Sequence, residues 1–289
     1  MEYVTLSNGI KMPLAGFGVF QVNDKAVCKQ SVLAAIRLGY RLIDTAAVYG
    51  NEDAVGEAVR EAIAEGLCTR DELFITSKLW VQDMANYKTA EQGIAASLQK
   101  SGLDYFDLYL LHQSMGDYFS AWHALETAYQ AGKFKAIGVS NFYAHTLTNF
   151  CETVTIRPMV NQVELHPFYA QADALETMKH YQVHPEAWAP LGGGRHQPYE
   201  HPLLQEIATA HGKTIAQVML RWNVQRGVTV IPKSTHSERI EENMNIWDFV
   251  LTEAEMDKIS ALDLGYVGEA VKHFNPGYVR RCLGIKIHD

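Results

Sequence analysis

The sequence predicts an α/β protein, a single domain over residues 1–289 that forms a closed (β/α)8 TIM barrel with an N-terminal β-hairpin. Eight apolar runs of β type alternate along the chain with amphipathic helical stretches, and this alternation is typical of a parallel sheet. Eight strands suit a closed barrel. An open, doubly wound sheet is the competing architecture, but the Gly-x-Gly at residues 16–18 is not followed by the GxGxxG phosphate turn of that fold.

The elements can be placed in order along the chain. Asn8-Gly9 separates two short strand-like runs and predicts the hairpin. The eight barrel strands are expected at residues 14–20, 41–45, 73–80, 106–112, 134–141, 158–164, 183–191 and 228–234. Helices are expected between them, for example at residues 24–39, 52–66 and 87–102, with ends marked by Gly39, Gly66, Gly102 and Gly132. Pro185 would remove a ladder hydrogen bond, so the seventh strand is expected to begin after it.

Composition excludes several classes of protein. The net charge is −8 and no basic run occurs, which argues against nucleic acid or an anionic membrane as a partner. No apolar stretch approaches the roughly 18 residues of a membrane span, and the N-terminus shows no secretory signal. We expect a reduced, cytoplasmic protein, because the cysteines are scattered and show no pairing in their spacing: Cys28, Cys68, Cys151 and Cys282. We expect no metal site, because neither HxH nor HExxH spacing occurs. We also expect a monomer or a dimer.

Polar residues recur where the predicted strands end. In a (β/α)8 barrel the carboxyl ends of the strands converge and carry the active site. The residues found there are Asp44, Lys78, His112, Ser140, Asn141, Gln162, Trp188, Lys233 and Ser234. Each has an ordinary structural explanation as well. Asp44 and Thr45 could cap the helix that begins near Asn51, and His112 could be a hydrogen-bonded core histidine. Their coincidence at one end of consecutive strands favours an active site.

These residue types suit the reduction of a carbonyl group. A tyrosine has a pKa of about 10, too high for efficient proton donation near neutrality. A nearby lysine ammonium favours the phenolate and lowers that pKa, and a carboxylate keeps the lysine charged. Asp44, Lys78 and Tyr49 can form such a chain, while neutral His112 can orient the carbonyl oxygen. We therefore expect Tyr49 to be the proton donor.

The chain resembles the aldo-keto reductases, and in particular the bacterial diketogluconate and methylglyoxal reductase-like members. The similar stretches include "LIDTAAVYGNEDAVG", "ITSKLW", "AIGVSNF", "MVNQVELHP", "AWAPLG" and "IPKSTHSERIEEN". The resemblance implies a (β/α)8 barrel that transfers hydride from NADPH to an aldehyde or ketone. It implies a catalytic tetrad of Asp44, Tyr49, Lys78 and His112.

The resemblance also implies how the cofactor is held. The nicotinamide carboxamide would contact Ser140, Asn141 and Gln162, and the nicotinamide ring would stack on Trp188. The loop "PLGGG", with Leu191 and Gly193, would approach the pyrophosphate, as glycine permits. The adenosine end would be held by Lys233, Ser234, Arg239, Glu242 and Asn243. A lysine and an arginine suit the 2′-phosphate that distinguishes NADPH from NADH.

The substrate pocket is expected to be aromatic. Phe20 and Trp80 follow the ends of the first and third strands, and with Tyr49 and His112 they would form its walls. Met115 and Tyr118 are expected to reach in from the loop after the fourth strand. Such walls suit a compact, weakly polar carbonyl compound. The short tail after residue 265 is expected to offer little that could close over a long ligand.

Two other classes remain open. Some barrels of this kind are regulatory subunits that bind the cofactor with little turnover. Barrel aldolases place a lysine at a strand end, and Lys78 could form a Schiff base in the same way. A Schiff base needs a neutral amine, whereas Asp44 and Tyr49 favour a charged one.

Overall fold

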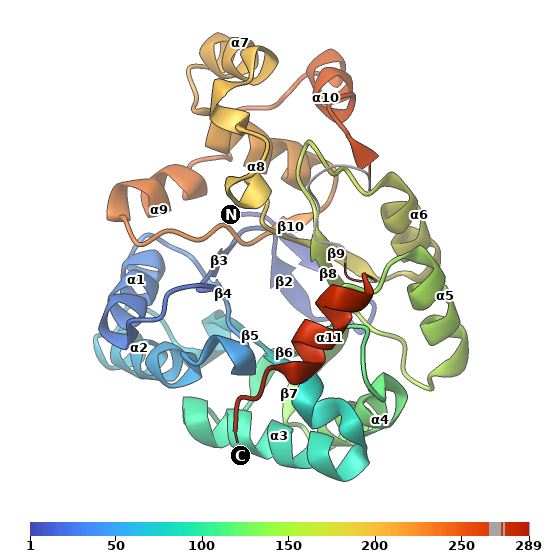
Figure 1. Ribbon diagram of the computed structural model, residues 1–289. Helices are drawn as coiled ribbons and strands as arrows, with labels where there is room; N and C mark the ends of the chain where they lie inside the picture. The colour runs from blue at the N-terminus through green and yellow to red at the C-terminus, as the bar shows by residue number, and fades with distance from the viewer. Residues whose placement is uncertain (266–272, 274, 289) are drawn as a thin grey trace.

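Eight parallel strands form a ring at the centre of the fold, with helices around it (Figure 1). The computed structural model describes residues 1–265, 273 and 275–288. The strands are hydrogen-bonded in the order in which they follow along the chain, from β3 to β10. A parallel bridge between Ala15 and Val230 joins the first and last of them and closes the ring. The predicted (β/α)8 barrel is confirmed.

The elements have the following bounds. The hairpin strands are β1 (Tyr3–Thr5) and β2 (Lys11–Pro13). The barrel strands are β3 (Gly16–Gly18), β4 (Leu42–Asp44), β5 (Phe74–Leu79), β6 (Phe106–Leu111), β7 (Phe134–Ser140), β8 (Val160–Glu164), β9 (His184–Trp188) and β10 (Thr229–Val230). The α-helices are α1 (Lys25–Arg37), α2 (Glu52–Ala64), α3 (Tyr87–Ser101), α4 (Tyr118–Gln130), α5 (Ala144–Thr153), α6 (Ala172–Tyr181), α7 (Pro202–His211), α8 (Ile215–Gln225), α9 (Ser237–Met244), α10 (Glu253–Ser260) and α11 (Pro276–Gly284).

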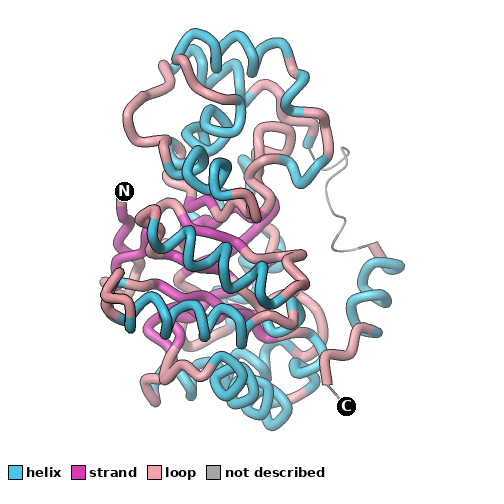
Figure 2. The backbone as a smooth tube through the Cα atoms, turned by 90° about the vertical axis from the view of Figure 1, so that its left-hand side faces the viewer, coloured by secondary structure: helices cyan, strands magenta, loops and turns pink. Residues whose placement is uncertain are grey.

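The hairpin and the helix ends have the geometry that their glycines allow. The Leu6 N–H donates to the Ile10 carbonyl at 2.8 Å, so a short loop with Gly9 at φ +88° turns the chain. Gly39 follows α1 with φ +95°, a conformation that is favourable only for glycine. The hairpin lies at the end of the barrel opposite α11 (Figure 2).

The prediction that the seventh strand begins after Pro185 is wrong. Strand β9 begins at His184, and Pro185 pairs with Asn161 of β8. The His184 N–H donates to the Met159 carbonyl on the β8 side, so the Pro185 nitrogen faces the other neighbour. Pairing with that neighbour, β10, begins only at Glu186, and the proline therefore interrupts no hydrogen bond of the ladder.

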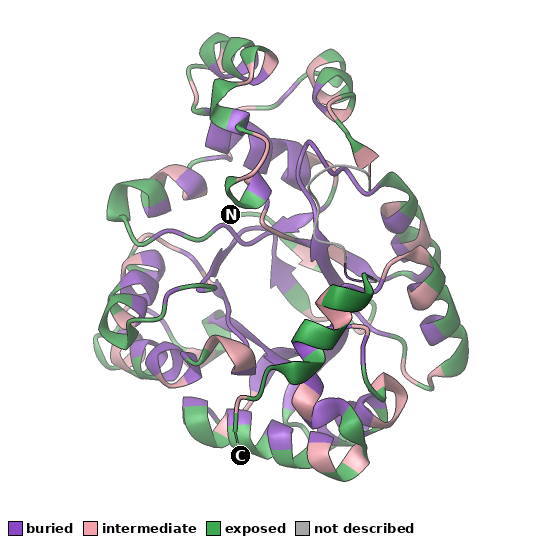
Figure 3. Cartoon of the chain, in the orientation of Figure 1, coloured by how far each residue is buried: buried purple, intermediate pink, exposed green. Residues whose placement is uncertain are grey.

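Burial separates the barrel from the outer faces of its helices. The barrel strands are buried except at the half-buried residues Lys135, Pro185 and Trp188, whereas α1 to α6 expose one side to solvent (Figure 3). All four cysteines are buried and form no disulfide. Among the described residues, none of the helices is long and apolar enough to cross a membrane.

Candidate active site

A buried lysine lies at the carboxyl end of the barrel. Lys78, in β5, is 0% exposed. Its Nζ donates to Asp44 Oδ1 at 2.6 Å, to the Thr45 carbonyl at 2.9 Å and to Tyr49 Oη at 3.5 Å. An ammonium has three hydrogens, so all of its donor capacity is used. The structure therefore brings together three of the four residues predicted for the tetrad.

Opposing effects set the charge of this pair. Burial lowers the pKa of Lys78, but the neighbouring acidic groups, Asp44 first among them, outweigh burial, and the net pKa is raised. Burial raises the pKa of Asp44, and the Lys78 ammonium and the Gln162 amide oppose that effect. Lys78 is therefore charged at neutral pH, as the sequence predicts.

Tyr49 lies on the loop after β4, in a 3-10 helix at Ala47–Tyr49. The expected lowering of its pKa is not the net result. Burial raises the pKa of Tyr49, and Lys78 lowers it by a smaller amount. The sequence could not reveal this balance, because it depends on how completely the hydroxyl is removed from water. Tyr49 is a neutral phenol, which is the form that donates a proton.

His112 is not a satisfied core histidine. It is 8% exposed, and its Nδ1 has no hydrogen-bond partner among the residues that the structure describes. Burial lowers its pKa well below the usual range, and the Lys78 charge lowers it further. Its ring centroid lies 5.5 Å from that of Tyr49. A neutral imidazole therefore stands next to the phenol, as expected.

The capping explanation for Asp44 does not hold. Asn51 is the N-cap residue of α2, and no side chain makes a capping hydrogen bond to this helix among the described residues. Asp44 therefore does not cap it. Thr45 instead donates from Oγ1 to Asn51 Oδ1 at 2.7 Å, while Asp44 turns to Lys78. Adjacent residues thus serve different purposes, since successive side chains of an extended chain point to opposite sides.

The predicted nicotinamide-binding residues form one connected group. Trp188 donates from its indole N–H to Asn141 Oδ1 at 2.9 Å. Asn141 donates from Nδ2 to the His112 carbonyl at 3.1 Å and to Ser140 Oγ at 3.0 Å. Gln162 donates from Nε2 to Asp44 at 2.8 Å. Asn141 has φ +63°, a strained value for a residue other than glycine and one that asparagine tolerates comparatively well.

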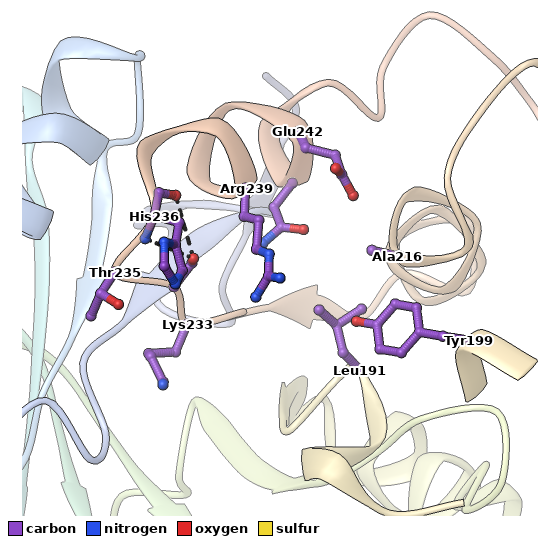
Figure 4. Close-up of a pocket in the computed structure, with 10 residues that line it drawn as sticks. Leu191, Tyr199, Ala216, Lys233, Thr235, His236, Arg239 and Glu242 are labelled. Atoms are coloured by element: carbon purple, nitrogen blue, oxygen red, sulfur yellow. Dashed lines mark hydrogen bonds between the residues drawn. The ribbon is translucent and has the colours of Figure 1, made fainter. Parts of the chain in front are cut away.

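The predicted adenosine-binding residues line a pocket of about 380 Å³. Its walls are Leu191, Tyr199, Ala216, Lys233, Ser234, Thr235, His236, Arg239, Glu242 and Asn243. Lys233 and Arg239 are exposed and, within the described part of the chain, neither forms an ion pair. Figure 4 shows the Arg239 side chain between Lys233 and Tyr199. Two such cations suit an anionic ligand.

Sequence reasoning missed four of the residues that line this pocket. Thr235 and His236 lie within "IPKSTHSERIEEN", so the motif could have indicated them. Tyr199 and Ala216 come from segments without a recognisable pattern. Leu191, from the loop predicted to approach the pyrophosphate, lines the pocket, and Gly193 lies two residues further along that loop.

The substrate side combines expected and unexpected walls. The Phe20 ring lies 5.0 Å from the Tyr49 ring, and the Trp80 ring lies 5.2 Å from that of His112. Tyr118 instead packs against Phe142 at 5.3 Å, with no ring contact to the tetrad among the described residues. Tyr118 is the first residue of α4, and the sequence did not indicate whether its side chain would point toward the tetrad or away from it.

The expectation that the tail offers little cover is wrong. Helix α11 crosses the mouth of the barrel (Figures 1 and 2). The Trp80 indole N–H donates to the Ile285 carbonyl at 3.0 Å, and Gln82 Nε2 donates to the His288 carbonyl at 2.8 Å. His273 Nδ1 lies 2.8 Å from Gln113 Oε1. Backbone carbonyls and side chains of this short segment both attach it to the barrel.

Comparisons with known proteins agree with this geometry. The sequence model of the Aldo/keto reductase family matches residues 15–264. The chain is 47% identical over 263 residues to a glyoxal reductase of Bacillus subtilis, covering 91% of this chain and 93% of that protein. It is 43% identical over 277 residues to a 9,11-endoperoxide prostaglandin H2 reductase of Trypanosoma cruzi, covering 95% of this chain and 96% of that protein.

A solved structure extends the likeness to three dimensions. The crystal structure of a Bombyx mori aldo-keto reductase in complex with NADP matches with a TM-score of 0.86 at 35% identity, over 91% of this chain and 92% of that chain. The family model and these relatives cover most of the sequence, including every barrel strand. The chain therefore belongs to the aldo-keto reductase family.

Proposed function

We propose that the protein reduces small aldehydes and ketones to alcohols, with Tyr49 as the general acid. The observation that carries this proposal is that Lys78 Nζ lies 2.6 Å from Asp44 Oδ1 and 3.5 Å from Tyr49 Oη. The lysine charge stabilises the phenolate that forms when Tyr49 gives its proton to the carbonyl oxygen. Neutral His112 holds the same oxygen by a hydrogen bond.

The residues at the mouth of the barrel fit the cofactor. Bound NADPH supplies the hydride that reaches the carbonyl carbon. Lys233 and Arg239 would hold the 2′-phosphate near the N-terminus of α9, where helix backbone N–H groups also favour an anion. Ser140, Asn141 and Gln162 would hold the carboxamide.

Cofactor choice is expected to depend on Lys233 and Arg239. Replacing either with methionine should weaken NADPH binding more than NADH binding, by about 1.5–3 kcal/mol, the value of a hydrogen bond to a charged group. Dissociation constants from quenching of tryptophan fluorescence measure the difference. Lys258→Met, at an exposed position of α10, is the matched control. Equal losses for the two cofactors would place these side chains outside the phosphate site.

Substrate choice is expected to favour compact compounds. Phe20 and Trp80 stand beside the tetrad, and the segment that follows α11 is hydrogen-bonded to Trp80. We expect a higher kcat/KM for methylglyoxal and nitrobenzaldehyde than for steroids, because burial against these walls suits a small ligand. A series of NADPH-oxidation assays measures this order. A clear preference for a polycyclic ketone would overturn the pocket as proposed.

Schiff-base chemistry at Lys78 and a purely regulatory role are less well supported. A Schiff base needs a neutral amine, but the pKa of Lys78 is raised and its hydrogens are all engaged. Borohydride would trap a covalent adduct if that chemistry occurred. A regulatory subunit would bind NADPH tightly without turnover. We also propose that the protein acts as a monomer in the cytoplasm, and its mass in solution tests the first part of this proposal.

A further inference from the structure

A second carboxyl group lies inside the barrel, outside the tetrad. Glu186, in β9, is 0% exposed and lies two residues before Trp188, so both side chains point to the same side of the strand. Its Oε2 accepts a hydrogen bond from Gln162 Nε2 at 2.9 Å, and its Oε1 has no hydrogen-bond partner within the described part of the chain. Burying a carboxyl group costs free energy of folding unless hydrogen bonds compensate for the lost water. A buried carboxyl group next to the tetrad therefore suggests a role in the site.

The Gln162 amide lies between two carboxyl groups. Its Nε2 donates to Asp44 Oδ2 at 2.8 Å and to Glu186 Oε2 at 2.9 Å. An amide NH2 has two hydrogens, so both are used. The reversed amide would place its oxygen against the Asp44 carboxylate, which excludes that orientation on electrostatic grounds. Gln162 Oε1 makes no hydrogen bond to any described residue and is the group left for a ligand.

We propose that Glu186 is a positioning residue for the reduction: with Asp44 it takes both amide hydrogens of Gln162, so that Gln162 meets the cofactor only as a hydrogen-bond acceptor. This inference rests on the proposed carboxamide site. Gln162 Oε1 can accept a hydrogen bond from the NH2 of the nicotinamide carboxamide but not from its oxygen. Gln162 therefore fixes the orientation of the carboxamide and of the nicotinamide ring that carries it.

Charge gives Glu186 a second effect on the site. Burial raises the pKa of Glu186 to about 8, the Asp44 charge adds to that rise, and Gln162 and Lys78 oppose it. Glu186 is therefore mostly protonated at pH 7, and Oε2 remains an acceptor. The groups that face it are Asp44 on β4, Lys78 on β5 and the Gln162 amide on β8. Its ionisation at higher pH raises the pKa of Tyr49, which makes the phenol a weaker acid.

Two variants separate these effects. Glu186→Met removes the acceptor while keeping a side chain of similar length. Glu186→Gln keeps an acceptor oxygen but cannot ionise. Glu126→Met is the matched control, because Glu126 is also a buried carboxyl, 7% exposed, but bonds the Ile156 N–H on the outside of the barrel.

The measurement compares NADP⁺ with its 3-acetylpyridine analogue, in which a methyl ketone replaces the carboxamide and the NH2 donor is lost. Dissociation constants come from quenching of tryptophan fluorescence. Wild-type protein, Glu186→Gln and Glu126→Met should prefer NADP⁺ by about two- to tenfold, the effect of one hydrogen bond. Glu186→Met should lose this preference. Full retention of the preference in Glu186→Met would overturn the proposal, as would its absence from the wild-type protein.

The pH profile of kcat decides the matter if Glu186→Met does not fold. Wild-type kcat for reduction should fall through a step near pH 8, where Glu186 ionises. The step should be absent from Glu186→Gln, because a glutamine cannot ionise. A step that persists in Glu186→Gln would come from another group and would count against Glu186. Wild-type turnover with NADPH at pH 7 tests the proposed function separately, because it does not depend on either comparison.

Discussion

Tyr49→Phe is expected to lower kcat for carbonyl reduction by about 10² to 10⁴-fold, the usual contribution of a general acid. The substitution removes only the hydroxyl, which lies 3.5 Å from Lys78 Nζ. The ring remains and keeps its contacts with Phe20 at 5.0 Å and His112 at 5.5 Å, so the fold and NADPH binding should be unchanged. Single-turnover NADPH oxidation measures the chemical step, and fluorescence titration measures cofactor binding.

A second tyrosine provides the control for Tyr49→Phe. Tyr3 is 51% exposed in the N-terminal hairpin, at the opposite end of the barrel, and Tyr3→Phe should leave kcat unchanged. Turnover of Tyr49→Phe within a few-fold of wild type would remove Tyr49 from the role of proton donor.

Lys78→Met is expected to reduce kcat to a similar extent, because the phenolate that forms at Tyr49 would lose its stabilising charge. It should also destabilise the fold by about 3–5 kcal/mol, since Asp44 would become a buried carboxylate without its cation. Assays of NADPH oxidation and urea unfolding measure the two effects. Lys133→Met, at an exposed position, is the control and should change neither.

A double variant separates catalysis from folding. Combining Lys78→Met with Asp44→Asn removes the unpaired charge, so part of the lost stability should return while kcat stays low. If the single variant does not fold, the double variant carries the test. Wild-type turnover in a folded double variant would show that the lysine charge does not act on Tyr49.

Much of the site could be predicted because it follows from strand periodicity. Asp44, Lys78 and His112 each lie at the carboxyl end of a strand. A closed barrel brings these ends together regardless of how its helices pack. Glu186 could have been found in the same way, since it lies two residues before Trp188 and must share its side of the strand.

Other features depend on neighbours that the sequence does not specify. Pro185 is tolerated because of where β10 begins, and Tyr49 has a raised pKa because of how deeply its hydroxyl is buried. The contact between Trp80 and the Ile285 carbonyl joins residues 205 positions apart, and no local pattern records it. Prediction therefore failed where a property is set by long-range packing.

The C-terminal segment attached to Trp80 and Gln82 and the pocket lined by Lys233 and Arg239 lie at different places around the ring. Helix α11 crosses the mouth beside β6 to β8, whereas α8 and α9, which border the pocket at Lys233 and Arg239, stand on the other side of the ring (Figure 1). A carbonyl compound would thus lie near the C-terminal segment, and the adenosine end of the cofactor near Lys233 and Arg239. Substitutions in residues 275–288 can reshape the access of one without altering the walls that hold the other. Redesign of substrate range and redesign of cofactor preference are therefore separable problems in this barrel.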